Sequence, residues 1–244
     1  MDVWTRAAVK KTLADFRGQK AYVGLDLSSG GDLTSIAIVI PFMQGEEKCY
    51  FVHAHSFIPK RRVEEHIKTD RVPYDLWIRQ GLVEVTETMG GVKTDYKYII
   101  AYLKKTVKLY ELDVQWICYD PHNASAFLAD LEALGFDSIA VKQSARELND
   151  PTVDFRLELE AGHVEHDGNE AMQWSIANAK TTRNSFKEIK IDKEYTTERI
   201  DIVDAIIDAW MMAMKGEVKP DVNRYLDIWF EGTEKLRQKG GAQG

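Results

Sequence analysis

The sequence has few cysteines, no long apolar run and no apolar leader. Cys49 and Cys118 are the only cysteines in 244 residues, and they form no CxxC pair. So few thiols exclude a disulfide scaffold, disfavour a cysteine zinc site and indicate a reducing compartment. The longest apolar run, 36–43, contains Pro41 and is far shorter than the ~20 residues of a membrane span. Because the polar N-terminus also lacks a signal-peptide core, we expect a soluble intracellular protein.

Positive charge is also in short supply. The chain has 32 Lys and Arg against 39 Asp and Glu, which gives a net charge of −7. A net-acidic molecule repels a polyanion, so charge alone argues against a nucleic-acid partner. Clustered carboxylates that bind cations would reverse this repulsion locally. The acidic balance therefore predicts DNA binding that is weak and steeply salt-dependent in the isolated domain.

The remaining composition supports one substantial core. Hydrophobic residues make up 44% of the chain and charged residues 29%, which is ordinary for a globular domain of this length. The pattern divides the chain into a lead-in helix over 1–20, a main domain over 21–215 and a charged tail over 216–244.

Hydrophobic patterning predicts an α/β fold with mixed strand directions. Three apolar segments joined by short turns predict an antiparallel meander over 21–27, 33–40 and 49–57. Strands and helices then alternate, a βαβ pattern typical of parallel strands: a helix over 95–110, a strand over 114–119, a helix over 124–134 and a strand over 139–141. Further elements are expected as irregular helix over 64–80, strands over 82–87 and near Val164, and helices over 154–161, from Gln173 and over 200–215.

Two aspartates occupy unusual positions in this pattern. Asp26 is the polar residue of the apolar strand Val-Gly-Leu-Asp-Leu, where a charge needs a reason. Alternatively, Asp26 is a charged residue of an edge strand and faces water. Asp120 closes the strand over 114–119, and ligands of open α/β sheets bind beyond the carboxyl ends of parallel strands. Its other role would be to cap the following helix.

The last predicted helix carries a third acidic group. At 100° per residue, Asp201, Asp204 and Asp208 share one face beside an apolar stripe. A solvated acidic face is the usual explanation for such a stripe. The two earlier aspartates, which are expected at a common sheet edge, make a shared site the better interpretation.

Together these carboxylates predict a site for two divalent cations. Hard carboxylate oxygens suit Mg²⁺ or Mn²⁺, and two ions about 4 Å apart can serve the attacking and leaving oxygens of a phosphoryl displacement. The pattern predicts phosphodiester hydrolysis with Asp26, Asp120, Asp201 and Asp204 as metal ligands and catalytic residues. Whether Asp201, Asp204 or Asp208 supplies the third acidic ligand stays open.

The same residues carry a resemblance to a known family. Four stretches match in order: Tyr22–Ser35, Tyr119–Ala124, His166–Ala179 and Arg199–Ile206. Over roughly 22–214 they resemble the ribonuclease H-like nuclease domain of phage terminase large subunits of the HK97 type. The resemblance implies a ribonuclease H-like mixed sheet flanked by helices.

The resemblance also implies an activity and partners. It implies a metal-dependent endonuclease that cuts concatemeric double-stranded viral DNA at the start and end of packaging, in the cytoplasm of the infected bacterium. Its partners would be the terminase ATPase domain, the portal protein and the small terminase subunit. The chain has no Gly-Lys dipeptide and so no GxxxxGK[ST] phosphate loop, which predicts that the ATPase is absent here and that 1–20 leads to it.

Residue by residue, Asp26 and Asp120 match the first two catalytic aspartates of the family. The third falls on Asp201, whereas the pattern of related resolvases would place Asp204 at the metals too. Three further positions are typical of the family and are expected to be structural: Gln143, Asn169 and Asn178. Asn169 is followed by Glu170 where the family usually has proline, which affects the local backbone.

Histidines and basic clusters add weaker signals. His163 and His166 have a metal-site interval but no third ligand nearby, so a structural role is favoured. His122 follows Asp120 closely enough to reach a phosphate. The basic groups are ordinary solvated faces unless they flank the acidic site, where they would contact phosphates: Lys60–Arg62, Lys104 and Lys105, and Lys180, Arg183, Lys187 and Lys190.

Two alternatives belong to other classes of protein. The segment after Asp26 is similar to the phosphate loop of sugar kinases and actin-like ATPases, although Ser28 stands where they have glycine. A non-catalytic docking module of a packaging motor, with its acids as plain surface, is the other alternative.

Overall fold

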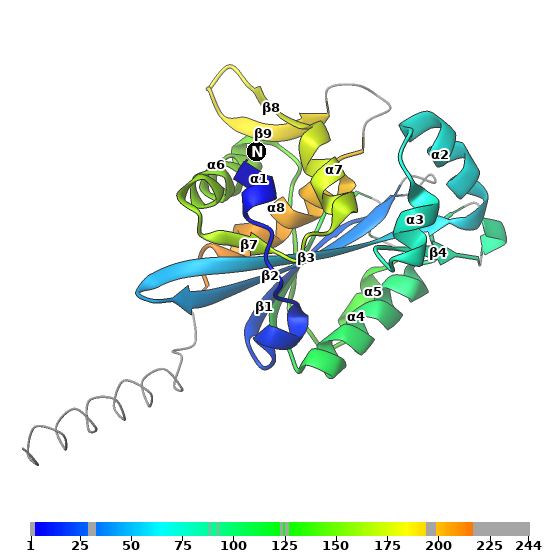
Figure 1. The fold of residues 1–244 in the computed structure, drawn as a ribbon, viewed down its shortest axis with the longest axis horizontal. Coiled ribbons are helices and arrows are strands. Elements are labelled where there is room, and N and C mark those ends of the chain that lie inside the picture. The colour runs from blue at the N-terminus through cyan, green and yellow to red at the C-terminus, as the bar shows by residue number, and fades with distance from the viewer. Residues whose placement is uncertain are drawn as a thin grey trace, which may run out of the picture.

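A mixed β-sheet forms the centre of the molecule (Figure 1). The computed structural model describes residues 3–28, 33–87, 89–91, 93–122, 124, 127–193 and 199–216. Within them a seven-stranded sheet has the order β4-β3-β2-β1-β5-β6, and β7 also pairs with β3. The strands are β1 (Lys20–Asp26), β2 (Thr34–Gln44), β3 (Glu47–Pro59), β4 (Val83–Thr86), β5 (Asp113–Tyr119), β6 (Ser138–Ala140) and β7 (Val164–His166).

The strand directions agree with the sequence-based prediction. β1, β2 and β3 form an antiparallel meander, and β4, β5, β6 and β7 each pair in parallel. Helices cover both faces (Figure 1): α1 (Val3–Arg6), α2 (Val63–Asp70), α3 (Tyr74–Arg79), α4 (Tyr96–Tyr110), α5 (Leu128–Glu132), α6 (Ala145–Ala161), α7 (Glu170–Asn178) and α8 (Asp201–Ala213). The predicted α/β class with a mixed sheet is confirmed.

Alternate residues of the sheet supply two separate cores. On one face, Val39 and Val52 pack with α8 residues such as Trp210. On the other face, Ile38 and Phe51 belong to the core that includes Leu103 of α4. The strand period of two places successive side chains on opposite faces, so near-continuous apolar strands fill both layers. No helix of the described residues is long and apolar enough to cross a membrane.

Several predicted elements differ from the observed ones. The predicted helix over 1–20 is broken into α1 and a 3-10 turn, Leu13–Phe16, because Thr12 starts a new capped turn with Asp15. The helix expected over 124–134 is limited to α5, whereas α6 is longer than expected and contains Pro151. Of the predicted tail over 216–244, only Gly216 lies within the described residues.

A β-hairpin was missed by the sequence-based prediction. β8 (Ala179–Arg183) pairs with β9 (Ile189–Lys193) in a separate two-stranded sheet beside α6 and α7 (Figure 1). β8 is mostly polar and exposed, and the alternation of Ile189 and Ile191 in β9 spans only five residues, so neither strand gives a strong signal.

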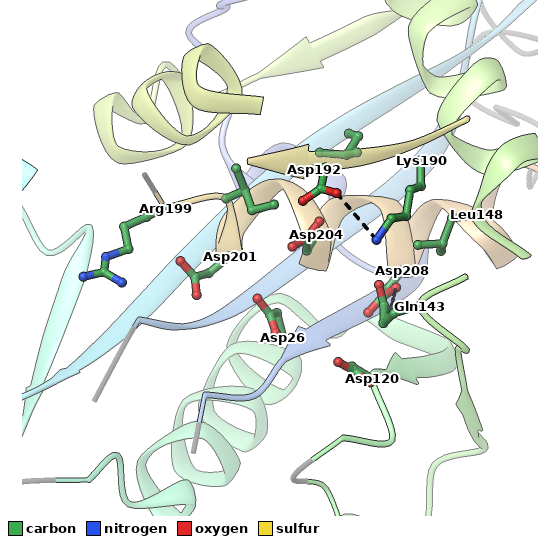
Figure 2. Close-up of a pocket in the computed structure, with 12 residues that line it drawn as sticks. Asp26, Asp120, Gln143, Leu148, Lys190, Asp192, Arg199, Asp201, Asp204 and Asp208 are labelled. Atoms are coloured by element: carbon green, nitrogen blue, oxygen red, sulfur yellow. Dashed lines mark hydrogen bonds and ion pairs between the residues drawn. The ribbon is translucent and has the colours of Figure 1, made fainter. Parts of the chain in front are cut away.

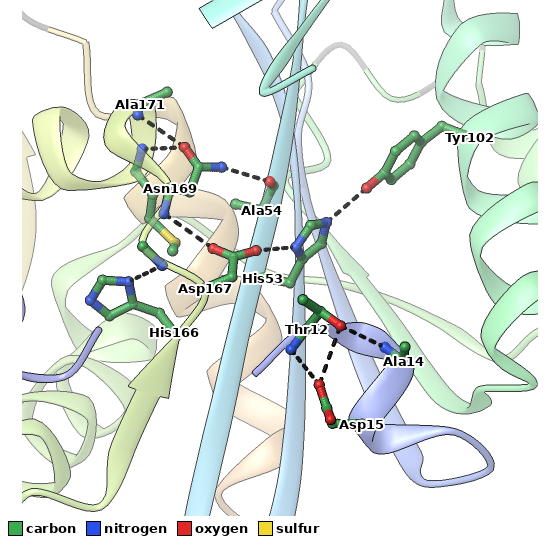
Figure 3. Close-up of polar contacts among 12 residues, drawn as sticks. Thr12, Ala14, Asp15, His53, Ala54, Tyr102, His166, Asp167, Asn169 and Ala171 are labelled. Atoms are coloured by element: carbon green, nitrogen blue, oxygen red, sulfur yellow. Dashed lines mark hydrogen bonds and ion pairs between the residues drawn. The ribbon is translucent and has the colours of Figure 1, made fainter. Parts of the chain in front are cut away.

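The loop after β7 is tied to the central sheet by polar contacts (Figure 3). Asp167 Oδ2 lies 2.5 Å from His53 Nδ1, and His53 Nε2 lies 2.9 Å from the hydroxyl of Tyr102 on α4. Asn169 caps α7 by accepting hydrogen bonds from two backbone amides, and its Nδ2 donates to the carbonyl of Ala54 on β3. A structural role for Asn169, as expected from sequence, is therefore observed.

α8 lies directly on β1 because β1 has no side chain at Gly24. A Cβ built on Gly24 would lie 1.8 Å from the carbonyl oxygen of Ala205 and 2.7 Å from the amide nitrogen of Ala209. This close approach places Asp26, two residues further along β1, beside the first turns of α8. The glycine thus sets the distance between two groups of acidic residues.

Replacing Gly24 by alanine is expected to push α8 away from β1. The atoms that meet the new methyl group are backbone atoms, which cannot move aside as a side chain does, so we expect a loss of about 3 kcal/mol in unfolding free energy and roughly 10 °C in Tm. Thermal unfolding of the two proteins measures the difference. An unchanged Tm would show that α8 does not need this close contact.

Candidate metal-binding and catalytic site

The four predicted site aspartates line one cavity at the carboxyl edge of the sheet (Figure 2). The cavity has a volume of about 290 Å³. Its described lining is mostly polar: Asp26, Asp120, Gln143, Leu148, Lys190, Ile191, Asp192, Arg199, Ile200, Asp201, Asp204 and Asp208.

The sheet brings Asp26 and Asp120 together although they are far apart in sequence. Asp26 ends β1, and Asp120 follows β5, which runs parallel to β1 with Leu25 opposite Tyr119. The amide of Asp120 donates to the carbonyl of Leu25 at 3.4 Å. Asp120 Oδ1 accepts a hydrogen bond of 2.9 Å from the amide of His122, so a local turn fixes this carboxylate.

β9 supplies the carboxylate of Asp192, and α8 supplies three further carboxylates. Asp201 and Asp204 lie in its first turn and Asp208 one turn further, and all three point toward the cavity (Figure 2). The rest of the helix is apolar and buried against β1 and β2, which fixes the rotation of its acidic face. The acidic face predicted from sequence is therefore a cavity wall, not a solvated surface.

Asp208 is the most deeply buried member of this group. It is 1% exposed, and its Oδ1 accepts a hydrogen bond of 3.0 Å from Gln143 Nε2. Its Oδ2 is buried and has no hydrogen-bond partner within the described residues. A buried carboxylate oxygen without a donor is costly, and a cation in the cavity would offset that cost. Sequence alone left Asp208 as one of three open choices and assigned Gln143 no part in the site.

Burial and mutual repulsion raise the pKa values of three of these carboxyl groups. Burial raises the pKa of Asp26 well above its usual range, and the charges of Asp201 and Asp204 add to the increase. The pKa of Asp204 rises to about 8, from burial and then from Asp201. Burial also raises the pKa of Asp208 well above its usual range, although the hydrogen bond from Gln143 opposes the shift. Bound cations would lower all of these values.

The donor set fits a hard divalent cation. Among the described residues, no three His, Cys, Asp or Glu side chains are arranged so that they could hold one metal ion as they stand. Mg²⁺ does not require such a cage, since it is usually held by one or two carboxylates, waters and substrate phosphates. Six carboxylates line the cavity; that of Asp192 pairs with Lys190, and the other five meet that requirement. The unpartnered oxygen of Asp208 indicates where positive charge is lacking.

None of the three histidines singled out from the sequence lines the cavity, neither the two expected to be structural nor His122, which the sequence places within reach of a phosphate. His166 is 2% exposed, stacks on Trp4 and donates from Nε2 to the Trp4 carbonyl at 2.9 Å. His163 pairs with Glu158. His122 contributes its backbone amide to Asp120, and its side chain is not part of the cavity lining.

The mixed sheet and its flanking helices define a protein of the ribonuclease H-like fold. Aspartates at the end of β1, just after β5 and on α8 line its cavity. Comparison with known proteins identifies the family. The model of the terminase large subunit endonuclease domain matches residues 2–217, so the chain belongs to the nuclease domains of phage terminase large subunits.

Two curated relatives match most of the length of this chain. The chain is 29% identical over 215 residues to the terminase large subunit of Enterobacteria phage HK97, covering 87% of this chain and 41% of that protein. It is 27% identical over 227 residues to protein YmfN of Escherichia coli K12, covering 89% of this chain and 48% of that protein. The chain therefore spans less than half the length of these relatives.

Solved structures show the same fold. The crystal structure of the HK97 large terminase superposes with a TM-score of 0.72 at 24% identity, over 86% of this chain and 41% of that one. The large terminase nuclease of the thermophilic phage G20c gives a TM-score of 0.52 at 12% identity, over 79% of this chain and 81% of that one.

Proposed function

We propose that this domain is a metal-dependent endodeoxyribonuclease that cuts concatemeric double-stranded viral DNA at the start and end of genome packaging. The observation that carries the proposal is one cavity lined by six carboxylates, three of them with raised pKa values. Such a cavity repels DNA by itself and becomes attractive to a phosphate only after it has taken up cations.

In this proposal Asp26, Asp120, Asp201 and Asp204 hold two Mg²⁺ or Mn²⁺ ions, and Asp208 is an additional ligand or fixes the inner wall. When bound, the ions supply Lewis acidity, which lowers the pKa of the attacking water and offsets charge on the departing 3′ oxygen. Asp26 and Asp120 come from the sheet and the others from α8, so the protein holds the phosphate between two rigid elements. Gln143 orients Asp208 by its hydrogen bond.

The whole terminase would supply what this domain does not contain. We propose that the partners are an ATPase motor domain, the portal protein and the small terminase subunit, and that the enzyme acts in the cytoplasm of the infected host. The kinase-like alternative gains no support, because the family match covers the whole described fold. A docking module without catalysis remains as an outcome of the experiment below.

Incubation of supercoiled plasmid with the purified domain tests the proposal. We expect nicked and linear products with Mn²⁺ and a slower reaction with Mg²⁺, and none with EDTA. The carboxylates need divalent cations before they can accept a phosphate, so the activity should return when Mn²⁺ is added in excess over EDTA. A domain that binds Mn²⁺ without cleaving DNA would favour the docking module.

The hairpin supports a nucleic-acid substrate. β9 lines the cavity with Lys190, Ile191 and Asp192, so Lys190 flanks the acidic site. Arg183 and Lys187 are exposed near the tip. There Asn184 Oδ1 accepts hydrogen bonds from the amides of Phe186 and Glu188, and Phe186 is 82% exposed. We propose that the β8–β9 hairpin contacts DNA phosphates next to the cut.

Neutralising the basic residues at the hairpin tip is expected to weaken DNA binding and to reduce its salt dependence. The double variant Arg183→Gln, Lys187→Asn removes two phosphate-binding charges, so the slope of log affinity against log salt should become shallower by roughly 2. Fluorescence anisotropy with duplex DNA over a salt series measures this slope. The matched control is Lys104→Gln, Lys105→Gln on α4, which should leave the slope unchanged. Equal slopes for the wild type and the Arg183→Gln, Lys187→Asn variant would exclude the hairpin contact.

A further inference from the structure

Asp70 is a buried carboxylate outside the aspartate group described above. It ends α2, and its side chain is 0% exposed. Its carboxylate accepts hydrogen bonds from the Tyr74 hydroxyl at 2.8 Å, from Thr69 Oγ1 at 2.7 Å and from Arg199 Nε at 3.2 Å. His66 Nδ1 lies 3.1 Å from Asp70 Oδ2. Burial raises the pKa of Asp70, but these hydrogen bonds and the charge of Arg199 outweigh burial and lower it to about 2.

Arg199 connects this cluster to the cavity. It lines the cavity two residues before Asp201, and its side chain is only 13% exposed. Its Nη2 lies 3.0 Å from His66 Nδ1, and its carbonyl accepts a hydrogen bond of 3.1 Å from Asn178 Nδ2. In Figure 2 the guanidinium points away from the carboxylates of α8. Thus Asp70 holds the side chain of Arg199 through Nε, while Asn178 holds its backbone through the carbonyl.

The orientation of Arg199 matters because arginine forms strong bidentate pairs with carboxylates. A guanidinium that turned toward Asp201 and Asp204 would occupy the space where cations bind and neutralise the same charges. Among the described lining residues the other cation, Lys190, already lies 3.8 Å from Asp192. The buried carboxylate of Asp70 offers Arg199 a partner in the opposite direction.

We propose that Asp70 is a positioning residue, which holds the guanidinium of Arg199 off the α8 carboxylates and presents it at the rim of the cavity to a phosphate of the bound DNA. The inference rests on the proposed nuclease function. A fixed guanidinium at the rim would stabilise the charge that develops on the phosphate during cleavage, because its orientation costs no reorganisation in the reaction. The carboxylates of α8 would then remain available to divalent cations.

Mn²⁺ binding without DNA tests the first part of this inference. In a titration followed by electron paramagnetic resonance, Asp70→Asn should bind Mn²⁺ roughly tenfold more weakly, because the released Arg199 competes for the carboxylates. The double variant Asp70→Asn, Arg199→Gln should regain wild-type affinity within about twofold. A purely structural role of Asp70 predicts no such rescue, so a double variant as weak as Asp70→Asn overturns the inference.

The single variant Arg199→Gln tests the second part of the inference, the contact between Arg199 and a DNA phosphate. It also provides a test if Asp70→Asn does not fold. It should bind Mn²⁺ like the wild type but show a higher KM and a lower kcat for DNA, whereas Arg79→Gln, an exposed arginine of α3, should show neither change. Wild-type kinetics in Arg199→Gln would overturn the phosphate contact. If the wild type itself binds no Mn²⁺, the proposed nuclease function fails. If it binds Mn²⁺ and only these variants deviate from expectation, the inference about Asp70 alone fails.

Discussion

Asparagine in place of Asp26 or Asp120 is expected to reduce plasmid cleavage by about three orders of magnitude, equivalent to roughly 4 kcal/mol of transition-state stabilisation. Asparagine keeps the shape of the side chain but removes the negative charge that a divalent cation requires. Asp26 ends β1 and Asp120 directly follows β5 at the cavity edge, so the rest of the fold does not depend on their charge. The variants should therefore be folded and inactive.

The measurement is the initial rate of plasmid nicking in Mn²⁺, with circular dichroism to verify folding. Asp130→Asn on the exposed face of α5 removes one negative charge outside the cavity and should cleave at the wild-type rate. Corresponding variants of Asp201, Asp204 and Asp208 rank the ligands supplied by α8. Wild-type activity in Asp26→Asn or Asp120→Asn would exclude the assigned role of that residue.

The second large effect concerns the stability of the metal-free domain. In the folded state the pKa values of Asp26, Asp204 and Asp208 are raised, that of Asp204 to about 8, above the ~3.9 of an unfolded aspartate. Between these limits the folded state binds more protons than the unfolded state, so the contribution of these groups to stability falls as pH rises. Without cations these carboxyl groups should therefore destabilise the folded domain more at pH 8 than at pH 6.

Mn²⁺ should reverse this destabilisation. At pH 8 a concentration of 100 times Kd adds about 2.7 kcal/mol to the unfolding free energy, and the gain should be smaller at pH 6, where protons compete. Asp204→Asn should raise the Tm of the metal-free domain at pH 8 and reduce the shift produced by Mn²⁺. Differential scanning fluorimetry in EDTA and in Mn²⁺ at both pH values measures these differences.

The comparison between wild type and Asp204→Asn isolates the site from other titrating groups. Asp130→Asn is again the control and should follow the wild type at both pH values. Asp70 acts in the opposite direction, since its pKa is lowered to about 2 and its contribution is lost only as pH falls through that value. A metal-free Asp204→Asn that is less stable than the wild type at pH 8 would contradict the repulsion described here.

The sequence predicts much of the fold because its strands are strongly apolar. The meander that contains Asp26 and the helix that starts at Asp201 were both placed closely, and the βαβ order implied that Asp120 would meet Asp26 at one edge. These are local patterns combined with a general rule for parallel strands. The sequence does not predict the burial of Asp208, because an acidic stripe on a helix is equally typical of a solvated face.

Contacts between distant segments were beyond sequence reasoning. The pairing of Asp70 with Arg199 joins residues 129 positions apart, and neither residue type carries a pattern that indicates the other. The hydrogen bond from Gln143 to Asp208 has the same character. The hairpin gives a weak signal because β8 is polar and β9 is short. The capped turn at Thr12 interrupts an otherwise helical pattern.

The central claim is that the carboxylates of β1, β5 and α8 bind divalent cations together. Crystals soaked in Mn²⁺ and measured at the manganese absorption edge test it most directly, because anomalous peaks locate the ions without regard to activity. We expect two peaks about 4 Å apart within the cavity, with Asp26, Asp120 and at least one of Asp201 and Asp204 as ligands. No anomalous peak in the cavity at saturating Mn²⁺ would contradict the account.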